Sequence, residues 1–144
     1  MKADATNLMV LDASVALAWC FPDESSPGGE KLLDSMADGL KAIVPAIWPF
    51  EVGNALLTAE RRKRLTIAQV TAALRNLAQL PIAIDSVQTE FVFGDVLAVA
   101  RHTQLTEYDA AYLEVALREG LPLATLDDRL RQAARNAGVR LLTV

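Results

Sequence analysis

The sequence predicts an α/β fold of three layers, in which a central, mainly parallel sheet lies between two layers of helices. Short apolar runs alternate along the chain with longer segments that have helical periodicity. No two apolar runs are joined by a hairpin turn signal. Strands that are separated by helices connect through right-handed crossovers, so we expect parallel pairing and a sheet covered on both faces.

Apolar runs and helical spacing define the expected elements in order. Five short apolar runs predict strands, at residues 8–11, 42–44, 82–84, 123–126 and 139–143. Seven segments with apolar residues at helical spacing predict helices, at residues 13–21, 30–40, 47–64, 67–80, 87–104, 107–118 and a last segment that ends at Asn136. Thr66 and Thr106 are the expected N-caps of two of these helices, and Gly120 ends the second. Gly94 is the weak point of the segment 87–104.

Composition sets the class of protein. The chain has 144 residues, of which 52% are apolar and 22% charged, so we expect one folded domain over residues 1–144. One Cys and one His exclude a disulfide framework and a zinc site of the usual ligands. The N-terminal segment MKADATNLMVLDAS has no apolar signal region, and no run is long enough to span a membrane. These features predict a cytoplasmic protein without a membrane span.

Four acidic residues stand in positions that favour a shared site. Asp12 follows the run LMVL and Asp127 follows LATL, so both carboxylates are expected at the carboxyl edge of the sheet. The alternative for either residue is a simple helix N-cap. Glu51 and Asp109 lie early in predicted helices with apolar flanks, and for Glu51 the alternative is stabilisation of the helix N-terminus. Because Asp128 directly follows Asp127, the choice between these two residues as the fourth acid stays open.

Converging carboxylates need a positive charge, because they repel one another and burial penalises each charged form. Cys and His are almost absent, so a hard divalent cation, Mg²⁺ or Mn²⁺, is the expected counter-ion. Such an ion activates water, and a phosphodiester is the natural substrate. The formal net charge of −4 disfavours a nucleic-acid partner at first sight, but the four acids account for the whole excess.

The segments VLDASVALAW, IWPFEVGNAL, LTEYDAAYLEVAL and LATLDDRL, in this order, resemble a PIN domain of the VapC toxin type. The resemblance covers essentially the whole chain. It implies an α/β/α PIN-like fold and a Mg²⁺- or Mn²⁺-dependent endoribonuclease that cuts single-stranded RNA, often in structured RNA such as tRNA. It also implies a homodimer that is held inactive by a cognate VapB-like antitoxin, the two forming a type II toxin–antitoxin pair.

The resemblance assigns roles to individual residues. It implies four catalytic, metal-binding acids, which fall on Asp12, Glu51, Asp109 and Asp127. It implies three supporting polar residues, which fall on Ser14, Asn54 and Thr125. The basic run Arg61, Arg62, Lys63 and Arg64 is either a solvated helix end or a patch that follows RNA phosphates.

Two other functions are alternatives to this one. A phosphatase of the haloacid-dehalogenase type requires a second Asp where this chain has Ser14. The remaining alternative is a PIN-domain nuclease or RNA-binding protein in RNA processing outside a toxin–antitoxin pair. A short upstream reading frame that encodes a DNA-binding antitoxin favours the toxin over this alternative.

Overall fold

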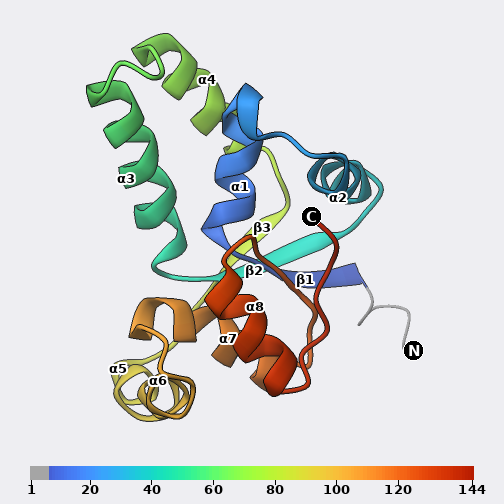
Figure 1. The fold of residues 1–144 in the computed structure, drawn as a ribbon, viewed down its shortest axis with the longest axis vertical. Coiled ribbons are helices and arrows are strands. Elements are labelled where there is room, and N and C mark those ends of the chain that lie inside the picture. Colours follow the sequence, from blue (N-terminus) through green and yellow to red (C-terminus); the bar gives the residue numbers. More distant parts are fainter. Residues whose placement is uncertain (1–6) are drawn as a thin grey trace.

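A parallel sheet of four strands lies at the centre of the computed structural model, which describes residues 7–144 (Figure 1). The strands are β1 (Leu8–Leu11), β2 (Lys41–Pro45), β3 (Ile82–Asp85) and β4 (Leu123–Ala124). Their order in the sheet is β3-β2-β1-β4, and all three pairs are parallel. Helices lie on both sides of the sheet, so the predicted three-layer α/β fold is confirmed.

The helical layers contain eight α-helices, one 3-10 turn and one π-helix within the described residues. They are α1 (Ala13–Cys20), η2 (Pro22–Glu24), α2 (Pro27–Ala37), α3 (Trp48–Arg61), α4 (Ile67–Ala78), α5 (Thr89–Phe91), the π-helix η3 (Val92–Val96), α6 (Leu97–Thr103), α7 (Glu107–Glu119) and α8 (Asp128–Asn136). In Figure 1, α1 to α4 lie above the sheet and α5 to α8 lie below it. Helices α1 to α4 therefore connect β1, β2 and β3 on one face, and α5 to α7 return to β4 across the other, with α8 following β4.

The strand order reverses between β1 and β4. From β1 the chain moves outward to β2 and β3, and it then returns to add β4 on the free side of β1. In open parallel sheets, ligands bind beyond the carboxyl ends of the strands where the order reverses. The residues that follow β1 and β4 therefore occupy the place where a functional site is expected.

Two helices begin at polar N-caps and one ends at a glycine, as the sequence predicts. The Thr66 hydroxyl accepts the backbone N–H of Gln69, whose side chain accepts the N–H of Thr66 in return, which forms a capping box on α4. Thr106 caps α7 by accepting the N–H of Asp109. Gly120 ends α7 with a φ of 65°, a conformation that suits glycine.

Three predicted elements differ clearly from the structure, one of them the strand 123–126, of which only Leu123–Ala124 is formed. The segment 87–104 is divided into α5, η3 and α6 instead of one helix, and Gly94 lies inside the π-helical part, where its weak helix propensity lowers the cost of the irregular turn. The predicted fifth strand, 139–143, is reduced to one bridge between Leu141 and Leu123. Because β4 has only two residues, it offers little ladder for a further strand.

Helix α7 packs on β1 and β2 and carries much of the core. Its side chains Tyr112 and Leu113 are fully buried. At its C-terminal end, Arg118 forms ion pairs with Asp85 (Nη2 to Oδ2, 2.6 Å) and Glu114 (Nε to Oε2, 3.0 Å), and its guanidinium lies over the ring of Phe91. Arg118 thus fastens α7 to the end of β3 and to α5.

The segment MKADAT, on which the prediction of no export signal partly rests, lies outside the described residues. Within residues 7–144, no helix combines the length and the apolar character that a membrane crossing requires.

Candidate active site

Asp12 directly follows β1 and lies at the reversal point of the sheet. Its position is the N-cap of α1, but its carboxylate makes no capping bond. The carboxylate Oδ2 instead accepts hydrogen bonds from the hydroxyls of Ser14 (2.6 Å) and Thr125 (2.7 Å). Helix capping therefore does not explain Asp12, and Ser14 and Thr125, two of the supporting residues that the resemblance implies, are in direct contact with it.

The environment of Asp12 disfavours its negative charge. Only 6% of the residue is exposed, and this burial raises the pKa of its carboxyl. The hydrogen bonds from Ser14 and Thr125 lower the pKa in part, and the negative charge of Asp127 raises it again. A bound cation would remove this penalty, because it stabilises the charged form.

Two hydroxyls join the ends of β1 and β4. Thr125 is fully buried, and its Oγ1 accepts the backbone N–H of Asp127 (3.0 Å) while its proton points to Asp12. The hydroxyl of Ser14 accepts the backbone N–H of Leu126 (2.9 Å). These bonds hold the acids at the two strand ends in a fixed relation.

Glu51 enters the site from the first turn of α3, and Tyr112 holds it. The phenol of Tyr112 donates a short hydrogen bond to Oε1 of Glu51. Burial raises the pKa of Glu51, the bond from Tyr112 lowers it, and the charges of Asp12 and Asp109 raise it further. Burial and the neighbouring Glu51 also raise the pKa of Tyr112, so the phenol keeps its proton and acts as a donor.

Tyr112 is the site residue that the sequence predictions missed. It stands three residues after Asp109 on α7, so the two share one face of that helix. This spacing was the available signal, because a Tyr one turn from a candidate acid can reach the same site.

Asp109 lies in the first turn of α7, after the cap Thr106. Burial raises the pKa of its carboxyl, and the charges of Asp127 and Asp12 raise it further. A hydrogen bond from Thr106 and the positive charge of Arg129 lower it in part. The four predicted acids therefore act on one another electrostatically, although they come from four different parts of the chain.

Asp127 caps α8, because its Oδ1 accepts the backbone N–H of Leu130 (2.9 Å). Its charge nevertheless contributes to the raised pKa values of Asp12 and Asp109. Asp128 is exposed in the first turn of the same helix. Asp127 thus combines the capping role with a place in the acidic cluster, and it remains our candidate for the fourth acid.

The other predicted residues lie farther from the acids. Asn54 is exposed one turn after Glu51, and no hydrogen bond of its side chain is found within residues 7–144. The basic run is at the opposite end of α3, about 15 Å from Glu51 for ten residues at ~1.5 Å each. Arg64 is ion-paired with Asp23 (3.1 Å) and Glu24 (2.7 Å), so its charge is already engaged.

The donor set suits a hard cation, although it is not preassembled. Within the part of the chain that the structure describes, no group of three or more Asp, Glu, His or Cys side chains is gathered closely enough to hold a metal ion. Mutual repulsion of the carboxylates opposes such a close arrangement. The donors at this edge of the sheet are carboxylate oxygens, which Mg²⁺ and Mn²⁺ prefer.

The fold and its cluster of acids define an α/β protein with an acidic site at the carboxyl edge of a parallel sheet. A family model of the PIN domain matches residues 9–136, so the chain belongs to the PIN domain family. Ribonuclease VapC3 of Pyrobaculum aerophilum is 32% identical over 124 residues, which are 86% of this chain and 92% of that protein. Ribonuclease VapC3 of Mycobacterium tuberculosis is 40% identical over 91 residues, and the match spans 62% of the length of each protein.

Solved structures share the fold. PAE2754 from Pyrobaculum aerophilum superposes with a TM-score of 0.69 and 25% identity, over 90% of this chain and 87% of that one. A chain from the structure of VapBC2 from Rickettsia felis, bound to a DNA fragment from their promoter, gives a TM-score of 0.66 over 93% and 96% of the two chains. At 13% identity, the second likeness shows the fold alone.

Proposed function

We propose that this protein is a metal-dependent endoribonuclease that acts as the toxin of a type II toxin–antitoxin pair, with the whole chain as one PIN domain. The observation that carries the proposal is the acidic cluster, in which the charges of neighbouring carboxylates help to raise the pKa values of Asp12, Glu51 and Asp109. Such perturbed groups are typical of functional sites. The two relatives named Ribonuclease VapC3 support the same activity.

In this mechanism, the carboxylates of Asp12, Glu51, Asp109 and Asp127 would hold Mg²⁺ or Mn²⁺, which would supply Lewis-acid chemistry for the hydrolysis of a phosphodiester by water. Ser14 and Thr125 fix the orientation of Asp12, and the protonated Tyr112 fixes that of Glu51. Asp127 is held by its capping bond at the start of α8. Hydrogen bonds within the chain thus orient the carboxylates of Asp12, Glu51 and Asp127.

The experiment that tests the proposal uses the purified chain and RNA. We expect cleavage of single-stranded RNA with Mn²⁺ or Mg²⁺ and none with EDTA, with 5′-phosphate ends at the cuts. Expression with and without the neighbouring antitoxin frame, followed by mapping of RNA 5′ ends, tests the toxin role. Growth arrest with discrete cuts supports a toxin. Cleavage by the purified chain without growth arrest favours RNA processing outside such a pair.

Metal binding is expected to stabilise the protein more at neutral than at acidic pH. In the metal-free protein, the raised pKa values of Asp12, Glu51 and Asp109 mean that the native state binds more protons than the unfolded state. The contribution of these carboxyls to stability therefore falls as the pH rises from about 4. A bound cation removes this loss, because it stabilises the charged form of the carboxyls. Mn²⁺ at 100 times its Kd adds about 2.7 kcal/mol. Thermal unfolding with Mn²⁺ and with EDTA at about pH 5 and about pH 7.5 measures the difference. An equal gain in stability from Mn²⁺ at both pH values contradicts the proposed metal site.

The basic residues Arg61, Arg62 and Lys63 are proposed to follow RNA phosphates. Arg64 is left out because its ion pairs with Asp23 and Glu24 engage its charge. Replacing the three residues with Ala is expected to weaken RNA binding and to reduce the salt slope by about 0.7 for each phosphate that is no longer neutralised. Fluorescence anisotropy at several salt concentrations, with EDTA present, measures the slope. An unchanged slope assigns the run to a solvated helix end.

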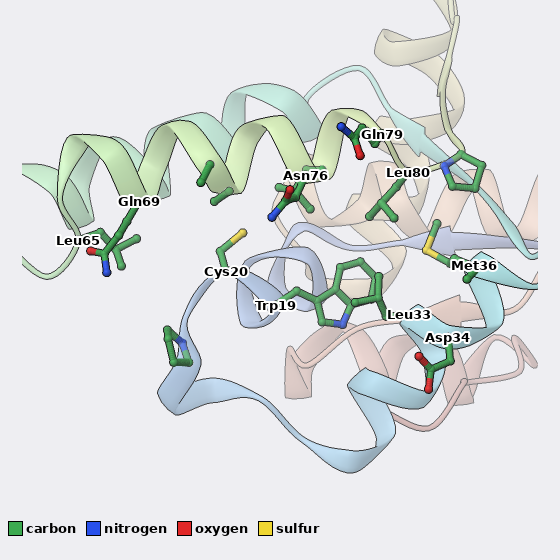
Figure 2. Close-up of a pocket in the computed structure, with 16 residues that line it drawn as sticks. Trp19, Cys20, Leu33, Asp34, Met36, Leu65, Gln69, Asn76, Gln79 and Leu80 are labelled. Carbon is green, nitrogen blue, oxygen red and sulfur yellow. The ribbon is translucent and has the colours of Figure 1, made fainter.

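An apolar groove between α1, α2 and α4 is the proposed docking site of the antitoxin. It encloses about 790 Å³, and Figure 2 shows Trp19 and Leu33 facing the side of α4 that carries Asn76. The floor is apolar and the rim carries amide side chains, which suits one amphipathic helix. By analogy, the resemblance to VapC toxins implies the apolar surfaces of residues 30–40 and 47–57 for this role, and only the first of these contributes to the groove.

A charge placed on α4 tests this surface. Ala72 is exposed and lines the groove, so Ala72→Arg is expected to weaken capture of the co-expressed antitoxin at least about tenfold without unfolding the chain. Arg75→Ala on the same helix, outside the groove, is the control. Equal capture by both variants contradicts this site. Size-exclusion chromatography with light scattering tests the proposed homodimer, and fractionation of cells tests the proposed cytoplasmic location.

A further inference from the structure

A second cavity lies between the C-terminal end of α6 and one face of α8, the helix that Asp127 caps. It encloses about 360 Å³, within the ~300–1,000 Å³ range of small-molecule pockets. Its polar lining consists mainly of Arg129, Gln132 and Asn136 from α8, together with His102 and Gln104. The lining of this cavity is more polar than that of the groove described above, because it includes one Arg and three amide side chains. Its chemistry therefore suits a polar ligand.

The α8 residues form a stripe along the cavity. Arg129, Gln132 and Asn136 are spaced by three and four residues, so they share one face of the helix, and Arg129 and Asn136 are exposed. Nε2 of Gln132 donates a hydrogen bond to Oδ1 of Asn136 (3.1 Å). This bond leaves Oε1 of Gln132 as an acceptor and Nδ2 of Asn136 as a donor, with no other side-chain partner among residues 7–144. An adjacent acceptor and donor match the edge of a nucleobase.

Arg129 connects this stripe to the acids. Its charge partly offsets the rise in the pKa of Asp109 that burial and the charges of Asp127 and Asp12 produce. Within the described residues, no carboxylate forms an ion pair with Arg129. Arg131, by contrast, donates to the backbone carbonyl of Thr125 (3.1 Å). Arg129 is therefore a cation at the border between the cavity and the acidic site that is available to a phosphate.

We propose that this cavity binds one nucleotide of single-stranded RNA next to the cleaved phosphodiester. Arg129 contacts a phosphate, the Gln132–Asn136 pair reads the edge of the base, and the exposed ring of His102 offers a stacking surface. Unstacked bases of single-stranded RNA are recognised in this way, by stacking and by hydrogen bonds to their edges. The inference rests on the proposed ribonuclease function, and it adds a source of sequence preference at one position of the substrate.

Nucleotide binding tests the cavity independently of cleavage. The probes are the four nucleoside 5′-monophosphates, titrated with EDTA present into ¹⁵N-labelled protein. We expect shifts of the side-chain amide signals of Gln104, Gln132 and Asn136, and a stronger response to one base than to the others. Shifts only at Arg61 to Lys63, or no shifts at all, overturn the proposal. This measurement remains valid even when the wild-type chain cleaves no RNA, in which case the proposed function fails separately.

Kinetics test the roles of the individual residues. Arg129→Ala is expected to raise KM about tenfold and to reduce the salt slope of RNA binding by about 0.7. The double variant Gln132→Ala with Asn136→Ala is expected to flatten the base preference at the cut and to leave the Mn²⁺ requirement unchanged. Arg135→Ala is the control, because it removes the same charge from α8 outside the cavity. Equal KM values and an identical cut pattern in all variants overturn the proposal.

Discussion

Asp12→Asn is expected to reduce RNA cleavage by about 100-fold or more, which corresponds to a loss of about 3 kcal/mol of transition-state stabilisation. The carboxylate is buried and held by Ser14 and Thr125, so no other acid of the described chain can take its position. The amide oxygen of Asn can still accept a bond from one hydroxyl. Single-turnover cleavage of labelled RNA in Mn²⁺ measures the effect.

Asp128→Asn is the matched control for this loss. It makes the same chemical change at an exposed acid next to the cluster, so we expect cleavage close to that of the wild-type chain. The metal-free Asp12→Asn protein is expected to be at least as stable as the wild type, because one buried charge and its repulsion by Asp127 are removed. A folded Asp12→Asn protein that still cleaves RNA at the wild-type rate would remove Asp12 from the catalytic site.

The sequence places Asp12 at a strand end but cannot decide between a helix cap and a site residue. The deciding contacts come from Thr125, which lies 113 residues later in the chain and approaches only when β4 pairs with β1. The same limit applies to Tyr112 and Glu51, which meet because α7 packs across the sheet toward the start of α3. Strand-end acids are thus predictable from local pattern, whereas the side chains that orient them depend on tertiary pairing.

Local rules succeed where one element determines the outcome. The caps Thr66 and Thr106 and the stop at Gly120 were all predicted, because each depends on residues within one turn. The segment 87–104 shows where these rules fail, since its periodicity indicates one helix while the packing divides it at η3. Arg64 is a second case, because its partners on η2 lie about 40 residues earlier in the chain.

Arg118→Met is expected to destabilise the protein by about 3 kcal/mol, because it leaves two buried acids without their cation. The side chains of Asp85 and Glu114 are only 10% and 7% exposed, whereas that of Arg118 is 27% exposed. Partial exposure of Arg118 moves the expected loss toward the lower end of the roughly 3–5 kcal/mol typical of such pairs. The Met side chain fills similar space over the ring of Phe91, so the loss reports on charge more than on packing. Urea unfolding, with the same m-value for both proteins, measures the change.

A triple variant that lacks all three charges separates the cost of removing the cation from the net contribution of the ion pairs to stability. Replacing Arg118 with Met, Asp85 with Asn and Glu114 with Gln is expected to recover most of the stability, because replacing every member of a buried ionic cluster is often close to neutral. Arg135→Met, on the exposed side of α8, is expected to change stability by less than about 0.5 kcal/mol. If Arg118→Met falls within that same range, Arg118 does not fasten α7 to β3. A triple variant as unstable as Arg118→Met would show that packing, and not uncompensated charge, makes Arg118 necessary.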